Sequence, residues 1–357
     1  MASKTWNVGV IGYGFSAKIF HIPFIQAVPD FKLYAIVQRH PKPDDDAEKD
    51  HPGIKAYRSA EDLVKDEAVD VVVVTTAPDS HVALTRLALE AGKHVVVEKP
   101  FTPTHQEADE LVALAKKQGK LLAVYQNRRW DTDFVTLSKL IKNGSLGRLV
   151  EYESHFDRYR PVIPNTDSWK YKVLPAGGAI YDLGTHLIDQ TVHLFGLPER
   201  VTGFIGSQRE NNPTGFEDSF TVLLHYKSGL LATVKCSVVS PEEKQLRFWV
   251  RGEQGSFKKY HLDIQEEQLI KGLRPGDKEY AQEPSDRYGV LTTIKDGKPT
   301  AEVVPTETST WVEYYRQLAR ALAGEGDVPV SGEQASAVIR LIELAKESSK
   351  LGKTLDV

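Results

Sequence analysis

The sequence predicts an α/β half with a doubly wound parallel sheet, followed by an α+β half with a large, mostly antiparallel, open sheet. Over residues 1–126, short β-branched runs alternate with longer helical stretches, which is typical of the βαβ units that build a parallel sheet. From Gly147 onward the pattern changes to longer strands in which apolar and polar residues alternate. We therefore expect two domains, spanning residues 1–126 and 127–357.

Length, charge and cysteine content limit the classes of protein to which this chain can belong. Its 357 residues can bury two hydrophobic cores, and 45 Lys and Arg against 49 Asp and Glu leave a formal net charge of −4. Without a long basic run, the charge pattern gives no reason to expect a nucleic-acid partner. The longest apolar stretch, residues 69–77, is far shorter than the ~20 residues of a membrane span. One cysteine, Cys236, and no recognisable leader favour a reducing compartment, so we expect a cytoplasmic protein with a small-molecule partner.

In the first half, the strands follow from valine-rich runs with little polar alternation, as expected where helices cover both faces of a sheet. Between two of them a helix is expected from Asp79 to Ala91, with Asp79 or Ser80 as its N-cap and Gly92 at its end. The expected strands are residues 7–11, 32–37, 69–74, 94–97 and 120–125.

A glycine fingerprint, Gly12-Tyr-Gly14-Phe-Ser-Ala17, directly follows the first strand. Gly12 allows a tight turn, Gly14 lets the backbone approach a diphosphate, and Ala17 permits close packing of the next helix, whose N-terminal N–H groups bind phosphate. We therefore expect a Rossmann dinucleotide-binding domain; an ordinary glycine-rich turn is the alternative. The residues expected to contact the cofactor here are Gly12, Tyr13, Gly14, Phe15 and Ser16.

The end of the second strand predicts which nicotinamide cofactor binds. An Asp or Glu about 20 residues after the fingerprint would hold the ribose 2′-hydroxyl of NAD. Here the strand ends in Gln38-Arg39-His40, and Arg39 can pair with a 2′-phosphate. We predict NADP, with NAD as the alternative if Arg39 is only a solvated charge. The acidic run 44–46 is interpreted as a solvated loop.

Two further segments carry candidate catalytic groups. Glu98-Lys99-Pro100 ends a strand at the edge of the sheet where ligands of open α/β folds bind. Glu98 and Lys99 are therefore expected to contact cofactor, and Lys99 is expected to exchange protons. The alternative is that Lys99 is an exposed lysine before a turn. Residues 177–194 read as one helix on which Asp182 and His186, four positions apart, form an acid–base pair that touches substrate. A surface ion pair, or a metal site that includes Asp189 or His193, would compete, but we expect no metal.

A third segment, residues 125–131, follows the last strand of the first half. Asn127 and Arg128 can hold the nicotinamide ribose or carboxamide, and Trp130 can form a wall of the site. A salt-bridge cluster around a core tryptophan is the alternative.

The second half is expected to form one open sheet, with a hairpin turn at residues 227–229 and the 177–194 helix on one face. Apolar residues occur in both registers of the strand around Val222, so a second subunit is expected on the other face. Residues 272–306 are polar and proline-containing and are expected to form an excursion over the sheet, while helices at 308–323 and 332–351 close the domain. The expected strands are residues 149–159, 200–209, 217–227, 229–239, 245–252 and 256–262.

These features together resemble the Gfo/Idh/MocA (glucose-fructose oxidoreductase/inositol dehydrogenase) family over nearly the whole chain. The shared marks are the G-x-G-x-x-A opening, the break at His21-Ile-Pro23, Glu98-Lys99-Pro100, and the Gly-Gly-x-x-x-Asp-x-Gly-x-His stretch that ends at His186. Residues 127–131 and 181–190 are most similar to the branch that contains NADP-dependent scyllo-inositol dehydrogenases and related sugar dehydrogenases.

The resemblance implies specific roles. Lys99, Asp182 and His186 match the catalytic trio, a cis peptide bond precedes Pro100, and Thr76, Pro78 and His81 fall where the family contacts cofactor. Trp169-Lys170 stands where relatives commonly carry Trp-Arg, so Trp169 is expected to contact substrate. Because Lys170 lacks the guanidinium fork, the resemblance does not imply which substrate is preferred. Family members pair through the open sheet face, which implies a homodimer or homotetramer.

The sequence therefore predicts an NADP-dependent dehydrogenase that transfers a hydride between its nicotinamide and a secondary alcohol of a sugar or cyclitol. A reductase of dicarbonyls or dihydrodiols is one alternative. A non-enzymatic regulator that senses nicotinamide nucleotides on the same fold is the other.

Overall fold

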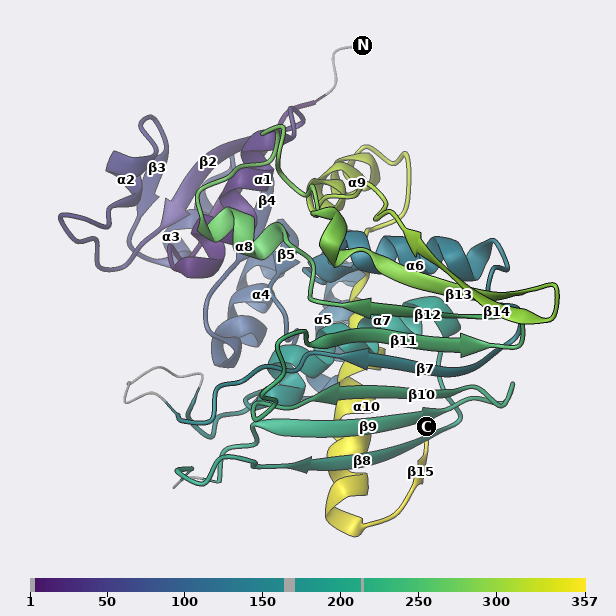
Figure 1. The fold of residues 1–357 in the computed structure, drawn as a ribbon. Coiled ribbons are helices and arrows are strands. Elements are labelled where there is room, and N and C mark those ends of the chain that lie inside the picture. The colour runs from purple at the N-terminus through teal and green to yellow at the C-terminus, as the bar shows by residue number, and fades with distance from the viewer. Residues whose placement is uncertain (1–3, 164–170, 213–214) are drawn as a thin grey trace. The chain divides into compact units, whose positions relative to one another are not determined.

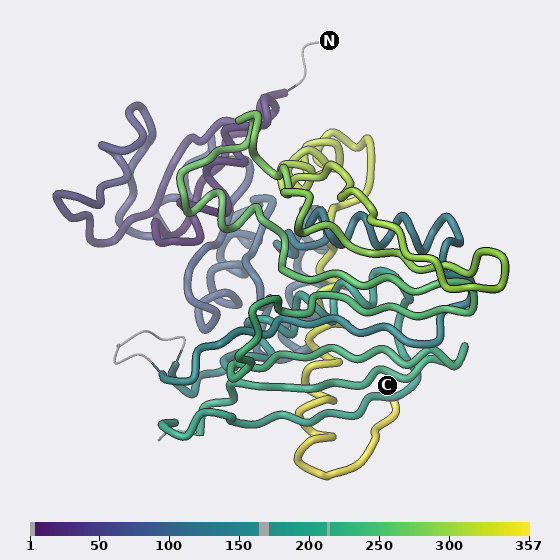
Figure 2. The backbone as a smooth tube through the Cα atoms, in the orientation of Figure 1, coloured from purple at the N-terminus to yellow at the C-terminus, as the bar shows by residue number. Residues whose placement is uncertain are grey.

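The computed structural model describes residues 4–163, 171–212 and 215–357 (Figure 1). The chain divides into two compact units, and its path can be followed in Figure 2. The first unit comprises residues 1–127, 266–280 and 310–337, and the second comprises residues 128–265, 281–309 and 338–357.

The first unit contains a six-stranded sheet in which every neighbouring pair of strands is parallel. The strand order β3-β2-β1-β4-β5-β6 is that of a Rossmann fold, which confirms the predicted class. Strand β3 is a short addition that the sequence analysis missed. The strands are β1 Trp6–Ile11, β2 Phe31–Val37, β3 Lys55–Tyr57, β4 Val71–Val74, β5 His94–Val97 and β6 Leu122–Val124.

Valine-rich strands form the centre of this sheet because both of its faces are covered. All four residues of β4 are buried, as are the three valines of β5. The longest helix between strands, α5, begins with a capping box made by Thr104 and Glu107 and ends at Gly119, whose backbone is left-handed. The helices are α1 Ile22–Ala27, α2 Ala47–Asp50, α3 Ala60–Lys65, α4 His81–Glu90, α5 His105–Gln118, α8 Gln265–Ile270 (from Glu266 onward) and α9 Val312–Leu322.

Helix α4 differs from its prediction at its N-terminus. A 3-10 turn, Pro78–Ser80, precedes the helix, and the Ser80 hydroxyl donates to the carbonyl of Ala77 at 2.7 Å. Ser80 is the N-cap residue, one of the two expected candidates, but its side chain makes no capping hydrogen bond. Gly92 follows the last turn in a left-handed conformation, as expected.

Helix α9, expected in the second half, belongs to the first unit. The aromatic residues at its start explain this position. The ring of Trp311 lies 6.2 Å from that of Phe24 on α1, and the ring of Tyr315 lies 5.8 Å from that of Phe31 on β2. The sequence pattern showed that this helix is amphipathic but not which core it joins.

The second unit contains a nine-stranded sheet in the order β14-β13-β12-β11-β7-β10-β9-β8-β15. Every neighbouring pair is antiparallel except β7 and β10, which confirms the predicted mostly antiparallel sheet. The six expected strands are all present, several of them shorter than expected. The strands are β7 Leu149–His155, β8 Arg200–Gly206, β9 Ser219–His225, β10 Leu231–Cys236, β11 Leu246–Gly252, β12 Gly255–Tyr260, β13 Gly289–Lys295, β14 Lys298–Val304 and β15 Leu355–Asp356.

Strands β13 and β14 correct the expected excursion over residues 272–306. They form a hairpin that extends the sheet at its edge, with Asp296 and Gly297 both at positive φ in the turn. Pro299 lies in β14, the edge strand, where a missing backbone N–H costs no ladder bond. Pro299 is therefore compatible with a strand at the edge of the sheet.

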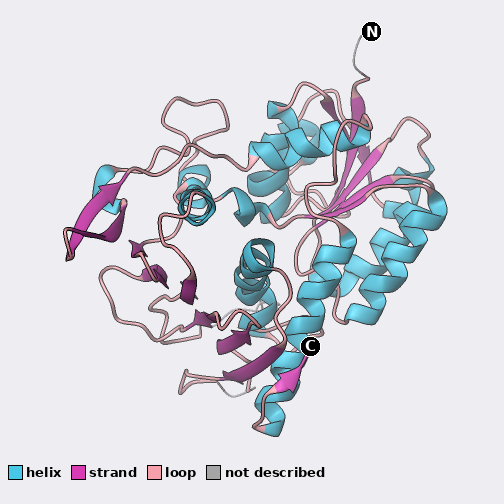
Figure 3. Cartoon of the chain, turned by 90° about the vertical axis from the view of Figure 1, so that its right-hand side faces the viewer, coloured by secondary structure: helices cyan, strands magenta, loops and turns pink. Residues whose placement is uncertain are grey.

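Helices cover one face of the nine-stranded sheet (Figures 1 and 3). Helix α7 Thr185–Phe195 contacts β10, α6 Thr132–Lys142 contacts β11 through Asp133 and Arg247, and α10 Gly332–Leu351 contacts β8 at Ala345. On the opposite face Phe204 is 61% exposed, and Leu223 and Trp249 are half-buried. Within the described residues, no helix combines the length and the hydropathy that crossing a bilayer requires.

We expect a Gly203→Ala substitution in β8 to destabilise the second unit. A Cβ atom at this position would overlap the carbonyl of Ala345 on α10, so the helix would have to move away from the strand. Overpacking of this kind typically costs about 1–3 kcal/mol in the free energy of unfolding. Gly206→Ala in the same strand is the matched control, because nothing lies within 4 Å of its Cβ position. Urea unfolding of both variants would show the difference, and equal midpoints would contradict it.

Candidate functional site

The fingerprint loop after β1 has the backbone that a tight turn requires. Gly12 has φ +104°, and its N–H donates to the carbonyl of Val37 at 3.1 Å. A Cβ at Gly12 would lie 2.9 Å from Oγ1 of Thr75, whereas nothing lies within 4 Å of the Cβ position of Gly14. Ala17 is fully buried. The open space at Gly14 fits the close approach of a diphosphate.

The side chains of this loop have different surroundings. Phe15 is 53% exposed, whereas Tyr13 is buried and its hydroxyl donates to Oδ2 of Asp50 at 2.7 Å. Burial, then the hydrogen bond to Asp50, raise the pKa of Tyr13 far above its usual value. The ammonium of Lys18 lies 4.2 Å from the centre of the Tyr13 ring and 2.5 Å from Oδ1 of Asp45.

At the end of β2, Arg39 is exposed and Gln38 is buried. The Gln38 amide donates to the carbonyl of Asp45 at 2.8 Å and accepts from the N–H of Ala47 at 2.9 Å, so it shapes the loop that follows. Asp46 caps α2 by accepting from the N–H of Glu48. Residues 44–46 lie in a loop that is exposed or half-buried, as interpreted from the sequence, and Asp45 and Asp46 also make structural contacts.

The loop after β4 contains three residues expected to contact cofactor: Thr76, Pro78 and His81. The hydroxyls of Thr76 and Ser80 lie 2.6 Å apart, and Pro78 is buried. His81 is fully buried, with Nδ1 at 2.8 Å from the carbonyl of Pro100 and Nε2 at 3.1 Å from that of Thr76. Burial lowers the pKa of His81. Its ring therefore links the loop after β4 to the loop after β5.

Glu98, Lys99 and Pro100 lie at the carboxyl end of β5. The peptide bond between Lys99 and Pro100 is cis, as the resemblance implied, and Lys99 is half-buried. Oε2 of Glu98 accepts the backbone N–H of Lys99 at 3.0 Å, and Oε1 contacts the hydroxyl of Ser16 and lies 3.0 Å from Nε2 of His21. Burial by itself raises the pKa of Glu98, but the contacts with His21, Lys99 and Ser16 outweigh it and lower the pKa to about 2. Glu98 is therefore an ionised acceptor of several hydrogen bonds.

In the second unit, Asp182 and His186 lie on two different kinds of helix. Residues Ile180–Gly184 form a π-helical turn and α7 begins at Thr185, so the prediction of one regular helix over 177–194 is corrected. Asp182 is half-buried and His186 is buried. Gly184 lets the π turn approach β9, because a Cβ there would lie 3.2 Å from the ring of Phe220. Single π turns inside helices occur frequently at functional sites.

The 3-10 turn Asn127–Trp130 is buried throughout. Arg129 donates to both oxygens of Asp189 on α7, at 2.8 and 2.7 Å. Arg128 Nη1 lies 3.3 Å from Oδ2 of Asp131, and its carbonyl accepts from the Gln190 amide at 2.6 Å. These contacts fit the alternative interpretation, a salt-bridge cluster around a core tryptophan. Trp130 is only 9% exposed.

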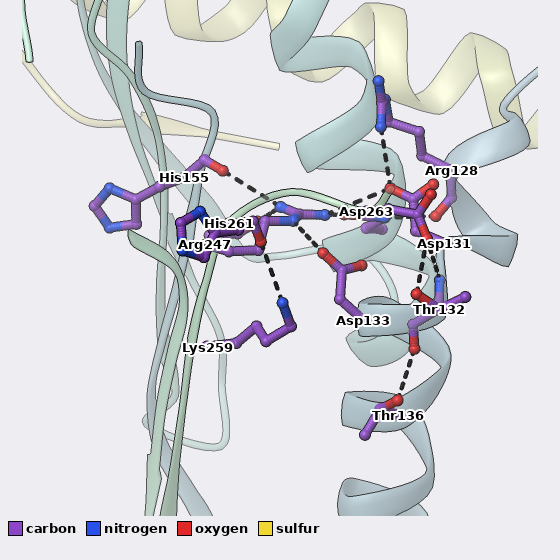
Figure 4. A network of polar contacts seen from close by, with 12 residues as sticks. Arg128, Asp131, Thr132, Asp133, Thr136, His155, Arg247, Lys259, His261 and Asp263 are labelled. Atoms are coloured by element: carbon purple, nitrogen blue, oxygen red, sulfur yellow. Dashed lines mark hydrogen bonds and ion pairs between the residues drawn. The ribbon is translucent and has the colours of Figure 1, made fainter. Parts of the chain in front are cut away.

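A buried polar network that the sequence analysis missed supports this turn (Figure 4). The guanidinium of Arg247, 1% exposed, donates to Asp133 at 3.0 Å, to Gln190 at 2.8 Å and to the hydroxyl of Ser154 at 2.9 Å. Asp263 accepts from both the N–H and the hydroxyl of Thr132. An arginine at an alternating strand position gives no sequence signal for burial, because its partners come from distant segments.

Trp169 lies outside the described residues. Among the residues that the structure describes, no three His, Cys, Asp or Glu side chains are grouped as metal ligands would be.

Comparison with known proteins identifies the family. Residues 6–126 match the oxidoreductase family's NAD-binding Rossmann fold, and residues 138–357 match that family's C-terminal alpha/beta domain. The chain belongs to the Gfo/Idh/MocA oxidoreductase family. The predicted family and the predicted dehydrogenase class are thereby confirmed, and the first domain of this Gfo/Idh/MocA protein is one that binds a nicotinamide nucleotide.

Relatives resemble this Gfo/Idh/MocA protein over almost its full length. The scyllo-inositol 2-dehydrogenase (NADP(+)) IolW of Bacillus subtilis is 37% identical, over 98% of this chain and 96% of the relative. An uncharacterized oxidoreductase of Schizosaccharomyces pombe is 39% identical, over 98% of this chain and 99% of its own. The solved structure of the oxidoreductase yvaA from Bacillus subtilis superposes with a TM-score of 0.94 at 36% identity and covers 100% of this chain and 99% of that one.

We expect Gly14→Ala to weaken nucleotide binding without unfolding the protein. The added methyl group meets no protein atom within 4 Å, but it occupies the space through which the loop approaches a diphosphate. The dissociation constants of NADPH and NADH, measured by the fluorescence of the reduced nicotinamide, should rise about tenfold or more, while the melting temperature stays within a few degrees. Gly326→Ala, on an exposed loop of the same unit, is the control. Wild-type affinity in the Gly14 variant would show that the loop does not approach the nucleotide.

Proposed function

We propose that this chain is an NADP-dependent dehydrogenase of a secondary alcohol in a sugar or cyclitol, or a reductase in the opposite direction. The observation that carries the proposal is the 37% identity, over 98% of the chain, with an enzyme named as an NADP-dependent scyllo-inositol 2-dehydrogenase. The open space at Gly14 and the positive φ of Gly12 support a bound dinucleotide. The bound nicotinamide accepts or supplies the hydride.

Within this proposal Lys99, Asp182 and His186 are the catalytic residues. Oxidation of an alcohol releases a hydride from carbon and a proton from oxygen, so the protein has to hold that oxygen and take its proton. Lys99 donates a hydrogen bond to the substrate oxygen, His186 accepts the proton, and Asp182 orients the imidazole or a second hydroxyl. The half-buried position of Lys99 at the carboxyl end of β5 supports its role, because ligands of open α/β sheets bind at that edge.

The proposed NADP preference rests on Arg39. This residue is exposed at the end of β2, where NAD-specific proteins carry a carboxylate that binds the ribose 2′-hydroxyl. The guanidinium can pair with the 2′-phosphate.

Other proposed cofactor contacts are Thr76, Pro78, Asn127 and Arg128. The hydrogen bonds of His81 favour an indirect role for this residue, in which it shapes the loop after β4.

We further propose that the chain forms a homodimer or homotetramer through the open face of the nine-stranded sheet. Phe204 and Trp249 lie on this face. The charged groups of Arg251 and Lys258 lie 4.4 and 4.3 Å from the centre of the Trp249 ring.

A reducing, cytoplasmic setting suits the one cysteine, Cys236, which is buried as a free thiol. Burial raises the pKa of Cys236 to about 12, so the thiol stays protonated and unreactive.

We expect Arg39→Ala to change cofactor preference rather than overall activity. Removing the guanidinium should lower kcat/KM for NADP by about 10- to 100-fold, because a charge-assisted bidentate pair is lost. The value for NAD, which has no 2′-phosphate, should change little. Steady-state rates with both cofactors provide the measurement. A wild-type preference for NAD, or an equal loss with both cofactors, would overturn the assignment.

Replacing Lys99 by Ala should lower kcat by about 10²- to 10³-fold, the usual effect of removing a hydrogen-bond donor to the charge that develops on the reacting oxygen. The assay follows reduced-cofactor absorbance with a panel of polyols that includes scyllo-inositol. Lys65→Ala removes an exposed lysine of the same unit and should leave the rate unchanged. Full turnover in the Lys99 variant would contradict its role. Nucleotide binding without turnover of any polyol, dicarbonyl or dihydrodiol would favour the sensing alternative.

A further inference from the structure

We propose that His21 and Tyr315 are positioning residues that act through Glu98 and Ser16 to hold the fingerprint loop in register with the strand end that carries Lys99. The proposal rests on the proposed function, because it assigns roles to residues around that same cofactor site. The four residues are called the Glu98 tether below.

The hydrogen bonds of the Glu98 tether form one continuous chain. The Tyr315 hydroxyl lies 2.7 Å from Nδ1 of His21, and Nε2 of His21 lies 3.0 Å from Oε1 of Glu98. Ser16 donates its hydroxyl proton to the same oxygen, and the backbone N–H of Lys99 donates to Oε2 at 3.0 Å. Because an ionised carboxylate only accepts hydrogen bonds, Nε2 of His21 carries a proton. Nδ1 accepts the proton of the Tyr315 hydroxyl where the ring is neutral and donates its own proton to that oxygen where the ring is charged.

The Glu98 tether is buried and confined by aromatic rings. His21 and Tyr315 are fully buried, and Glu98 is 7% exposed. The ring of Tyr125 lies 4.1 Å from that of His21, and its hydroxyl donates to the carbonyl of Phe20 at 2.5 Å. Hydrogen bonds to a charged group are stronger in such surroundings than in water. Small displacements of these residues are therefore unfavourable.

The order of the strands explains why the position of the fingerprint loop relative to Lys99 depends on the Glu98 tether. The fingerprint loop follows β1 and Lys99 follows β5, and β4 lies between these two strands. Backbone hydrogen bonds of the sheet therefore do not join β1 directly to β5. Glu98 spans this gap, because it binds Ser16 and His21 after β1 and the backbone of Lys99 after β5. A misplacement of about 1 Å between cofactor and catalytic group can cost about 100-fold in rate.

The Glu98 tether also changes the predicted role of two residues. Ser16 and Glu98 were expected to contact cofactor, but each uses its side chain for the other. Since the Ser16 hydroxyl donates its proton to Glu98, it does not donate that proton to a phosphate. The backbone N–H of Ser16 and the lone pairs of its hydroxyl oxygen are left for contacts with the cofactor. Glu98 remains an ionised carboxylate, and both of its oxygens are engaged by hydrogen-bond donors of the protein.

The test combines Tyr315→Phe and Ser16→Ala, each of which removes one oxygen atom, and the double variant. NADPH and NADH are the probes, titrated by nicotinamide fluorescence. We expect each single variant to raise the dissociation constant of the nucleotide that binds more tightly by about fivefold or more. The double variant should raise it by less than the product of the two, because both changes act through Glu98. Ser16→Thr, which keeps the hydroxyl, should restore binding.

Tyr57→Phe is the matched control. It removes a tyrosine hydroxyl that donates to a carboxylate of the same unit, Asp66, at 2.7 Å, on the outermost strand β3. It should lower the melting temperature without changing nucleotide affinity. If Tyr315→Phe and Ser16→Ala behave like this control, the Glu98 tether is only structural and the proposal is overturned.

The outcome is separable from that of the proposed function. Preference of the wild-type protein for NADH would overturn the NADP assignment, while the ratio of variant to wild-type affinity would still report on the Glu98 tether. A wild-type protein that bound neither nucleotide would overturn both.

Discussion

The first unit depends on a buried carboxylate, Glu98, whose negative charge is kept by hydrogen bonds and by electrostatic attraction from His21 and Lys99. Glu98 lies at the carboxyl end of β5 in surroundings that would by themselves favour its protonated form, yet its pKa falls to about 2. His21, the charge of Lys99 and the hydroxyl of Ser16 lower this pKa, and the backbone N–H of Lys99 also donates to the carboxylate. Desolvation is outweighed only while all of these segments stay in place, so the ionised state of Glu98 and the geometry of the loops depend on each other.

In the second unit a buried charge is likewise held by hydrogen bonds, but this charge is positive. The guanidinium of Arg247 is buried, and its donors are shared between α6, α7 and β7. Burial raises the pKa of Asp131 well above its usual range, although Arg128 and Arg247 oppose the shift. In each unit a π-helical turn, Ala17–His21 or Ile180–Gly184, overlaps a segment for which we propose a function. An added residue in a helical turn changes the direction of the side chains that follow, and such turns are frequent where side chains serve a specific function.

Sequence patterns were most informative where the structure is local and periodic. The valine runs predicted the central strands of the parallel sheet, and the alternation around Val222 and Val234 predicted strands that are buried on one face. The hairpin at residues 289–304 was missed because its exposed strands lack the alternation that burial imposes, and because prolines argue against strands in general. The π turn before α7 was missed because a helical repeat in sequence does not distinguish i+4 from i+5 hydrogen bonding.

The sequence by itself determined the fold class, the position of the fingerprint, the family, and the strand end at which Lys99 stands, because each of these depends on residues that are neighbours along the chain or recur at a fixed period. Only the tertiary structure decided which groups share a proton or a charge. Ser16 and Glu98 are 82 positions apart, and His21 and Tyr315 are 294 apart, so no local pattern records their contact. Such pairs exist only after the sheet has brought its strand ends together, because the hydrogen bonds of a buried carboxylate are satisfied by whatever donors the fold places beside it.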